Sequence, residues 1–190
     1  SPRPTTKRPP IPARTTLVSH HTRKRVTFHL FIGTAVVHDG SMESRLILVS
    51  NRGPATFHRD ESGARVVERG GGGLVSALAG LTDHEPALWV SAAMSDEDLV
   101  VSGEHGGGSF SLPGVGNDTL GRFVTIDPAV YNAYYNVIAN PILWFIQHYL
   151  WDLSNAPDIR RAELDAWDKG YVAANHAFAD AVIAELDLRP

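Results

Sequence analysis

Three short apolar runs, separated by segments of helical character, constrain the fold of this chain more than any other feature. They are RLILVS at 45–50, ALWVSAA at 87–93 and GRFVTID at 121–127. Short continuous apolar runs are typical of strands buried on both faces, and strands that alternate with helices favour a parallel sheet. The sequence therefore predicts an α/β domain with a parallel sheet and flanking helices.

The segments between these runs carry signals of their own. Residues 55–67 alternate loosely between apolar and polar around Glu61-Ser62-Gly63, which predicts a hairpin. Residues 70–73 are four glycines that stand directly before LVSALAGL, an apolar helix start. Residues 102–120 are rich in Gly, Ser, Pro and Asn, so we expect a loop there.

The last third of the chain has helical periodicity. Pro128 is suited to the first turn of a helix, as the acids at 96–98 are suited to the start of an earlier one. Beyond Pro128, apolar residues recur at spacings of three and four, so they share helical faces. The two faces consist of Tyr131, Tyr134, Tyr135, Ile138, Ile142, Phe145 and Tyr149, and of Trp167, Tyr171, Phe178, Val182 and Leu186.

The first part of the chain differs in composition from the rest. Residues 1–41 hold seven basic residues and one acid, and their opening combines Pro, Thr and basic side chains that cannot bury enough apolar surface to offset chain entropy. The apolar run at 26–37 is short for a membrane span but fits the apolar core of a secretory signal; alternatively, Met42 is the natural start. We expect residues 1–43 to be a disordered basic leader or a non-native upstream segment, and residues 44–190 to be the folded domain.

Composition excludes several classes of site. The chain has no cysteine, which rules out a disulfide scaffold, a cysteine-ligated zinc site and a thiol nucleophile. Its nine histidines include no H-E-x-x-H pattern, so we expect no metal. The net charge of −4 gives no argument for nucleic acid, and we expect no membrane partner.

Two familiar signatures fail on their context. Gly71-x-Gly73, with Asp96 further along the chain, resembles a dinucleotide-binding loop, but there the glycines follow the first strand immediately, and here Gly70 comes 20 positions after Ser50. The H-G-G-G run that begins at His105 resembles the oxyanion loop of lipases, but the chain has no G-x-S-x-G pentapeptide to supply the nucleophile.

Arg52 and the glycines at 70–73 form the strongest candidate site. Arg52 follows the strand predicted at 45–50, and α/β proteins bind ligands at the carboxyl ends of parallel strands. Its planar guanidinium suits bidentate contact with a phosphate, and a glycine loop that opens a helix lets backbone N–H groups approach an anion. From spacing alone, a surface ion pair for Arg52 and a flexible hairpin end for the glycines are equally good interpretations.

Four motifs resemble those of the trehalose-6-phosphate synthases, glycosyltransferase family 20, and are most similar to its actinobacterial branch. They are LILVSNRGP at 46–54, RGGGGLVSAL at 69–78, YNVIANPILWFIQHY at 135–149 and W-x-x-x-Y-V-x-x-N-x-x-F-A-D-A-V at 167–182. Their order and spacing agree with the family along about residues 45–186, and the set is specific where each motif alone is weak.

The resemblance implies a GT-B fold, in which two Rossmann-like domains enclose a cleft, with this chain as an incomplete N-terminal, acceptor-side domain that ends before its last strands. It implies transfer of glucose from a nucleotide sugar, UDP- or GDP-glucose, to glucose 6-phosphate with retention at the anomeric carbon. The nucleotide sugar is then a co-substrate and no cofactor is expected. The resemblance further implies a cytoplasmic enzyme, and it leaves homo-oligomerisation open.

The resemblance also assigns residues. Arg52 matches the family arginine that binds the acceptor phosphate, and Tyr135 and Trp144 match the aromatic pair that borders the glucose 6-phosphate site. Gly73, together with Gly72, matches the glycines whose backbone approaches the donor. No catalytic residue is expected within this chain, because the family's D-Y-H-L strand and donor-binding residues would lie beyond Pro190, so we expect the chain alone to be inactive.

One departure affects the expected acceptor. Many relatives carry W-x-G-W where this chain has Trp89-Val90-Ser91-Ala92, so Ala92 takes the place of an aromatic acceptor contact. A related transferase with an aminocyclitol acceptor therefore remains an alternative. A non-catalytic module that binds a sugar phosphate for regulation is a second alternative.

Overall fold

A computed structural model describes residues 15–18, 25–31, 34–39, 46–71, 73–84, 86–116, 118–148, 150 and 158–187. The strands are β1 Thr15–Val18, β2 Arg25–Phe31, β3 Thr34–Asp39, β4 Leu46–Ser50, β5 Ala55–Arg59, β6 Arg65–Arg69, β7 Ala87–Ala92, β8 Phe110–Ser111 and β9 Leu120–Val124. The helices are α1 Gly73–Thr82, α2 Asp96–Glu104, α3 Pro128–Tyr131, η1 Asn132–Leu143, α4 Trp144–Gln147, α5 Arg161–Ala166, η2 Trp167–Val172 and α6 Ala173–Asp187.

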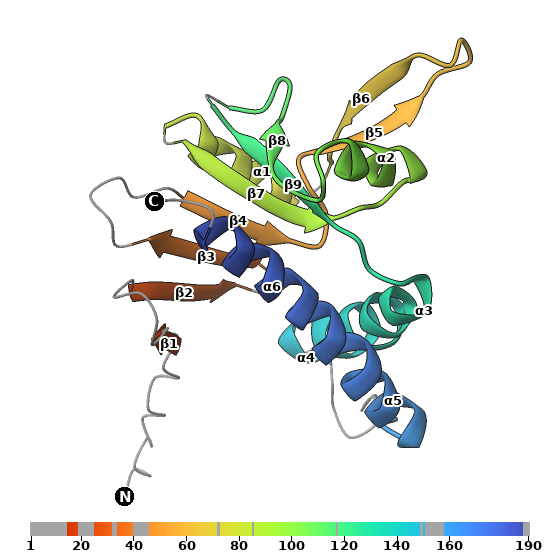
Figure 1. The fold of residues 1–190 in the computed structure, drawn as a ribbon. Helices are drawn as coiled ribbons and strands as arrows, with labels where there is room; N and C mark the ends of the chain where they lie inside the picture. Colours follow the sequence, from red (N-terminus) through yellow and green to blue (C-terminus); the bar gives the residue numbers. More distant parts are fainter. Residues whose placement is uncertain are drawn as a thin grey trace, which may run out of the picture.

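The main sheet has seven strands in the order β1-β2-β3-β4-β7-β9-β8, and β5 and β6 form a separate hairpin that projects from the domain (Figure 1). β4, β7 and β9 are parallel neighbours, with Leu46 opposite Ala87 and Leu88 opposite Leu120. These strands are the three predicted apolar runs, so the α/β architecture is confirmed. β8, which pairs with β9, lies within the segment predicted to be a loop.

The described parts of the N-terminal segment are three strands. β1, β2 and β3 extend the sheet beyond β4 in antiparallel register, and Thr34 lies opposite Ser50. These three stretches lie within the segment expected to be a leader, and the rest of that segment lies outside the described residues. A run rich in β-branched and aromatic residues fits a pleated sheet and covers the otherwise unpaired edge of β4.

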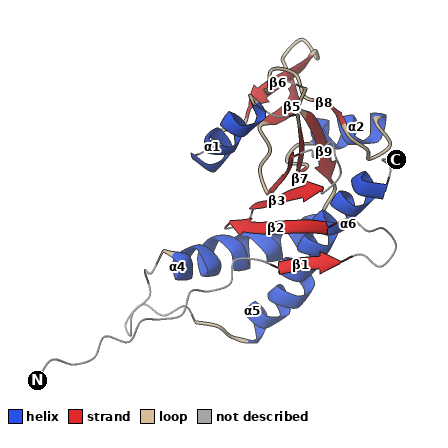
Figure 2. Ribbon diagram, turned by 90° about the vertical axis from the view of Figure 1, so that its left-hand side faces the viewer, coloured by secondary structure: helices blue, strands red, loops and turns tan. Residues whose placement is uncertain are grey.

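Each face of the parallel strands carries its own core. Leu48 and Trp89 face one way, toward α1, α2 and the hairpin, whereas Ile47, Leu88 and Val90 face the other way, toward η1 and α6. The alternation follows from the two-residue period of a strand. α1 and α6 accordingly lie on opposite sides of the sheet (Figure 2).

The described region after Pro128 is helical, as its periodicity predicted. Asp127 caps α3, with Pro128 in its first turn, and η1 and η2 adopt the wider π pattern of hydrogen bonds. Gly170 packs so closely on η1 that a Cβ there would overlap Ala133. Trp167 is exposed and stacks on Tyr171 with ring centroids 4.6 Å apart.

Among the helices that the structure describes, none combines the length and apolar character needed to cross a membrane.

Candidate functional site

A chain of hydrogen bonds that begins in the buried core fixes the loop after β4. The indole Nε1–H of Trp89 donates to the Ser50 hydroxyl at 2.7 Å, and that hydroxyl donates to the Arg52 carbonyl at 2.7 Å. The N–H of Ala92 adds a bond to the Asn51 carbonyl at 3.2 Å. The backbone at Arg52 is therefore fixed to the sheet while its side chain extends outward.

Two glycines bring the end of the hairpin beside this loop. The Gly70 N–H donates to the Pro54 carbonyl at 2.7 Å, and a Cβ on Gly70 would overlap the Gly53 carbonyl oxygen. A Cβ on Gly53 would lie 2.5 Å from the Ser91 hydroxyl oxygen. The two chain segments can cross this closely only because neither residue carries a side chain.

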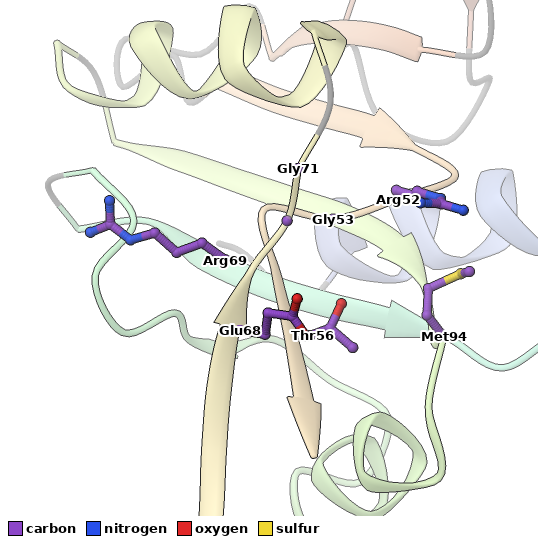
Figure 3. A pocket seen from close by; sticks show the side chains of 8 residues that line it. Arg52, Gly53, Thr56, Glu68, Arg69, Gly71 and Met94 are labelled. Carbon is purple, nitrogen blue, oxygen red and sulfur yellow. The ribbon is translucent and has the colours of Figure 1, made fainter.

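The crossing leaves a cavity of about 270 Å³, which we call the Arg52 cavity. Figure 3 shows the side chains around it. Its lining consists of Arg52, Gly53, Thr56, Glu68, Arg69, Gly70, Gly71 and Met94. The cavity thus joins the end of β4, both strands of the hairpin and the glycine loop that leads into α1.

The two arginines of the Arg52 cavity differ in how they are engaged. Arg69 donates to the Gly114 carbonyl at 2.9 Å, and its guanidinium points away from Arg52 (Figure 3). The exposed guanidinium of Arg52 makes no hydrogen bond or ion pair to any residue that the structure describes. Arg52 therefore presents a positive charge at this end of the parallel sheet.

A tyrosine hydroxyl, which the sequence did not predict as part of the site, lies next to the loop. Tyr131 accepts a hydrogen bond from Asn51 Nδ2 at 3.0 Å, and its hydroxyl lies 3.6 Å from the sulfur of Met94. Burial raises the pKa of Tyr131, whereas the Asn51 hydrogen bond and the positive charge of Arg52 act in the opposite direction. The ring stacks on Tyr135 with centroids 5.8 Å apart, which connects Tyr135 to the loop.

The predicted site residues are brought together only in part. Arg52 lines the cavity, together with Gly70 and Gly71 of the glycine run. Gly73 is the first residue of α1, and Gly72 lies outside the described residues. Tyr135 is connected to the loop through Tyr131, on whose ring it stacks, whereas Trp144 does not line the cavity.

Trp144 begins α4 and is 47% exposed. Its ring stacks on His148 with centroids 4.2 Å apart and planes 29° apart. Tyr135 and Trp144, the expected aromatic pair, therefore do not enclose the Arg52 cavity within this chain. Ala92, the departure from the family pattern, is buried in the core beneath α6.

No three histidine, aspartate or glutamate side chains come together as a metal-holding group in the described ranges. The polar groups that line the Arg52 cavity are two guanidinium groups, of which that of Arg52 has no partner among the described residues, one carboxylate, one hydroxyl and backbone groups of glycines. This set suits an anionic, hydroxyl-bearing ligand.

Comparison with known proteins gives one family and a consistent set of relatives. The family described as glycosyltransferase family 20 matches residues 44–188. The α,α-trehalose-phosphate synthase [UDP-forming] of Schizosaccharomyces pombe is 31% identical over 152 residues, which cover 78% of this chain and 26% of the relative. The validamine 7-phosphate valienyltransferase of Streptomyces hygroscopicus is 27% identical over 74% of this chain and 28% of its own length.

Among solved structures, a trehalose-6-phosphate synthase OtsA is 25% identical, and the match covers 74% of this chain and 26% of that one with a TM-score of 0.48. The chain thus spans about a quarter of the length of the relatives that it matches.

Proposed function

Because the chain belongs to glycosyltransferase family 20, we propose that it forms the acceptor-side part of an enzyme that transfers glucose from a nucleotide sugar to glucose 6-phosphate, with retention at the anomeric carbon. The product is α,α-trehalose 6-phosphate. The nucleotide sugar, UDP- or GDP-glucose, is a co-substrate, and the reaction needs no further cofactor.

The observation that carries this proposal is the guanidinium of Arg52, which lines the Arg52 cavity and has no hydrogen-bond or ion-pair partner in the part of the chain that the structure describes. Arginine offers a planar fork of N–H donors that matches a phosphate, and a charge-assisted pair of this kind is roughly twice as strong as a neutral hydrogen bond. The fixed backbone at Arg52 supports the same role, because a guanidinium presented from a rigid loop loses less freedom when it binds.

The donor is proposed to approach the glycine end of α1. Gly73 begins this ten-residue helix, whose first turn contains no acidic residue. The N-terminal end of a helix attracts phosphate through its free N–H groups and its dipole. Gly72 and Gly73 are therefore proposed to contact the nucleotide sugar. Tyr135 and Trp144 are proposed to border the acceptor sugar, since flat aromatic faces suit sugar C–H groups.

A second candidate acceptor is an aminocyclitol phosphate. It is favoured by the relative named for validamine 7-phosphate and by Ala92, which stands where many relatives carry an aromatic. Arg52 would bind the phosphate of either acceptor, so this residue does not separate the two.

The experiment is an acceptor panel on the intact protein. UDP-glucose and GDP-glucose are each offered with glucose 6-phosphate, glucose or an aminocyclitol phosphate, and nucleotide release is measured. Release with glucose 6-phosphate and not with glucose supports the proposal, and selective release with the aminocyclitol phosphate supports the second candidate. Binding of glucose 6-phosphate without release with any pair would indicate a regulatory module instead.

A further inference from the structure

The hairpin contributes two side chains to the Arg52 cavity that the proposed function does not use. Thr56 of β5 and Glu68 of β6 lie directly opposite each other in the hairpin register, and both line the cavity. Figure 3 shows the Thr56 hydroxyl and the Glu68 carboxylate side by side. Among the described residues, neither side chain has a hydrogen-bond or ion-pair partner, so both polar groups are free to meet a ligand.

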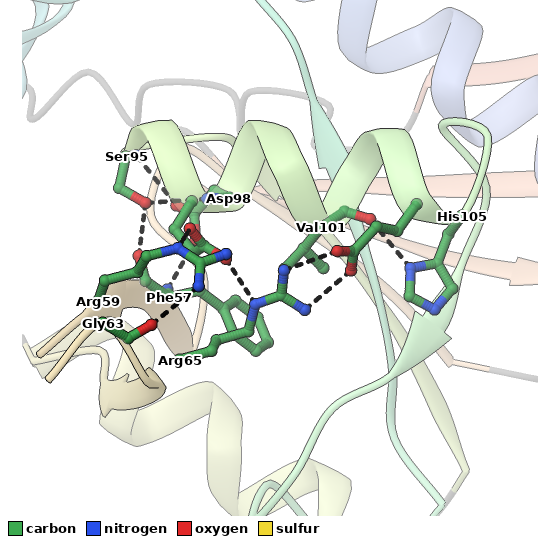
Figure 4. A network of polar contacts seen from close by, with 10 residues as sticks. Phe57, Arg59, Gly63, Arg65, Ser95, Asp98, Val101 and His105 are labelled. Atoms are coloured by element: carbon green, nitrogen blue, oxygen red, sulfur yellow. Dashed lines mark hydrogen bonds and ion pairs between the residues drawn. The ribbon is translucent and has the colours of Figure 1, made fainter.

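The opposite face of the same hairpin is fixed to α2, as Figure 4 shows. Arg59 and Arg65 both reach the carboxylate of Glu97, at 2.8 Å and 2.6 Å, and Arg65 also forms two 2.8 Å bonds with Glu104. These side chains and those of Thr56 and Glu68 point to opposite faces, because side chains alternate along a strand. The anchoring therefore leaves the cavity side of the hairpin open.

The base of the hairpin is held more tightly still. The Phe57 N–H donates to the fully buried carboxylate of Asp98 at 2.7 Å, and the Ser95 hydroxyl donates to the Phe57 carbonyl at 2.6 Å. Asp98 also accepts from the Met94 N–H at 2.8 Å. Thr56 is thus adjacent to a residue bonded on both its backbone groups, and Met94 on the cavity wall is held by the same carboxylate.

We propose that Thr56 and Glu68 form a subsite that recognises hydroxyl groups of the acceptor sugar whose phosphate Arg52 holds, an inference that rests on the proposed function. A carboxylate only accepts hydrogen bonds and therefore suits sugar hydroxyls, while a threonine hydroxyl both donates and accepts. Glu68 repels a phosphate and Arg52 attracts one, so the two charges orient a sugar phosphate in one direction across the cavity.

The test is calorimetric binding to the intact protein, with glucose 6-phosphate and inorganic phosphate as the two probes. Glu68→Gln is expected to weaken glucose 6-phosphate binding by about tenfold, since a hydrogen bond to a charged group becomes a neutral one. Binding of inorganic phosphate is expected to stay equal or become tighter, because a negative charge has left the cavity. Thr56→Val is expected to weaken only glucose 6-phosphate, by a smaller factor.

Glu61→Gln is the matched control, because it removes the same charge from the turn of the same hairpin without touching the cavity. Unchanged glucose 6-phosphate binding in Glu68→Gln would overturn the inference, and so would an equal loss for both probes. A change confined to the nucleotide sugar would overturn its assignment to the acceptor.

Failure of the inference can be told apart from failure of the proposed function. If Arg52→Ala abolishes glucose 6-phosphate binding while Glu68→Gln leaves it unchanged, only the hydroxyl subsite is refuted. If Arg52→Ala leaves glucose 6-phosphate binding unchanged, the proposed phosphate contact itself is refuted. Monodeoxy analogues of glucose 6-phosphate complete the test: the loss caused by Glu68→Gln is expected to vanish for at least one of them, and an equal loss for all would contradict hydroxyl recognition.

Discussion

The Trp89 indole and the Ser50 hydroxyl form a buried 2.7 Å hydrogen bond that connects the core of the sheet to the backbone of Arg52. Trp89 is fully buried and Ser50 nearly so. The indole N–H needs an acceptor at this depth, and the Ser50 hydroxyl supplies it while donating its own hydrogen bond to the Arg52 carbonyl. The serine that satisfies the buried indole therefore also fixes the conformation of the candidate phosphate-binding loop.

Ser50→Ala is expected to lower the free energy of unfolding by about 1–3 kcal/mol, because the indole N–H is left buried without an acceptor. It is also expected to weaken phosphate binding, since the Arg52 carbonyl loses its anchor. Urea unfolding and phosphate titration measure the two effects. Ser111→Ala, at an exposed position of β8, is the control and should change neither. A destabilised variant with unchanged phosphate affinity would show that these hydrogen bonds stabilise the core without influencing phosphate binding.

Arg52→Ala is expected to weaken acceptor binding by roughly 10- to 150-fold, the equivalent of about 1.5–3 kcal/mol for a charge-assisted bond. Arg52→Lys should recover only part of this, because a point charge cannot reproduce the guanidinium fork. The measurement is glucose 6-phosphate titration of the intact protein, with folding followed by circular dichroism. Arg161→Ala removes a largely exposed arginine on α5 and should leave binding unchanged. Equal affinities in both variants would contradict the assignment of Arg52.

The features that the sequence predicted are local ones. The runs that form β4, β7 and β9 are recognisable as strands by their continuous apolar residues. Arg52 and the glycine run stand at chain positions that an α/β fold places at one edge of the sheet. The crossing of the hairpin end over the β4 loop could not be predicted, since it depends on a close approach of Gly70 to Gly53 that no spacing reveals.

The features that the sequence missed depend on long-range contacts. Tyr131 joins the loop through a hydrogen bond to a residue 80 positions earlier, so its periodicity indicated only a helical face. The π pattern of η1 was hidden for a related reason, because apolar spacings of three and four are equally compatible with an α-helix. The strands at 25–31 and 34–39 lie in a segment whose basic and proline-rich composition predicts a leader, and pairing between strands cannot be seen in composition.

Gly70→Ala is expected to destabilise the protein by about 1–3 kcal/mol, because the new Cβ would overlap the Gly53 carbonyl and force the two segments apart. Gly71→Ala is the matched variant, since nothing lies within 4 Å of its Cβ position. It should change the free energy of unfolding by less than about 0.5 kcal/mol. Thermal and urea unfolding compare the two. Similar losses in both variants would mean that the loop needs glycine flexibility rather than close approach.

The ion pair of Arg65 with Glu104 makes the stability of the folded state depend on pH. Hydrogen bonds from Arg65 hold the pKa of Glu104 below its ordinary value of 4.5. A carboxylate with a lowered pKa stabilises the folded state above its unfolded pKa, and this contribution is lost as the pH falls through the folded pKa. Arg65→Gln should therefore cost stability near neutral pH, and its difference from the parent should shrink below about pH 4. Carboxyl NMR titration checks the cause: in Arg65→Gln the pKa of Glu104 should rise toward 4.5, and an unchanged pKa would contradict it.

Hydrogen exchange on the intact protein tests the antiparallel extension of the sheet. β3 pairs with β4 from Thr34 to His38, so the amides of residues 34–38 that face β4 should exchange slowly. Removing residues 1–41 turns β4 into an edge strand, and its amides that face β3 should then exchange faster, while those of β9 serve as the internal control. Fast exchange across residues 34–38, with β4 unaffected by the deletion, would support a leader outside the packed domain. The outcome bears on the candidate site as well, because Ser50, the anchor of the Arg52 carbonyl, lies opposite Thr34 in this register.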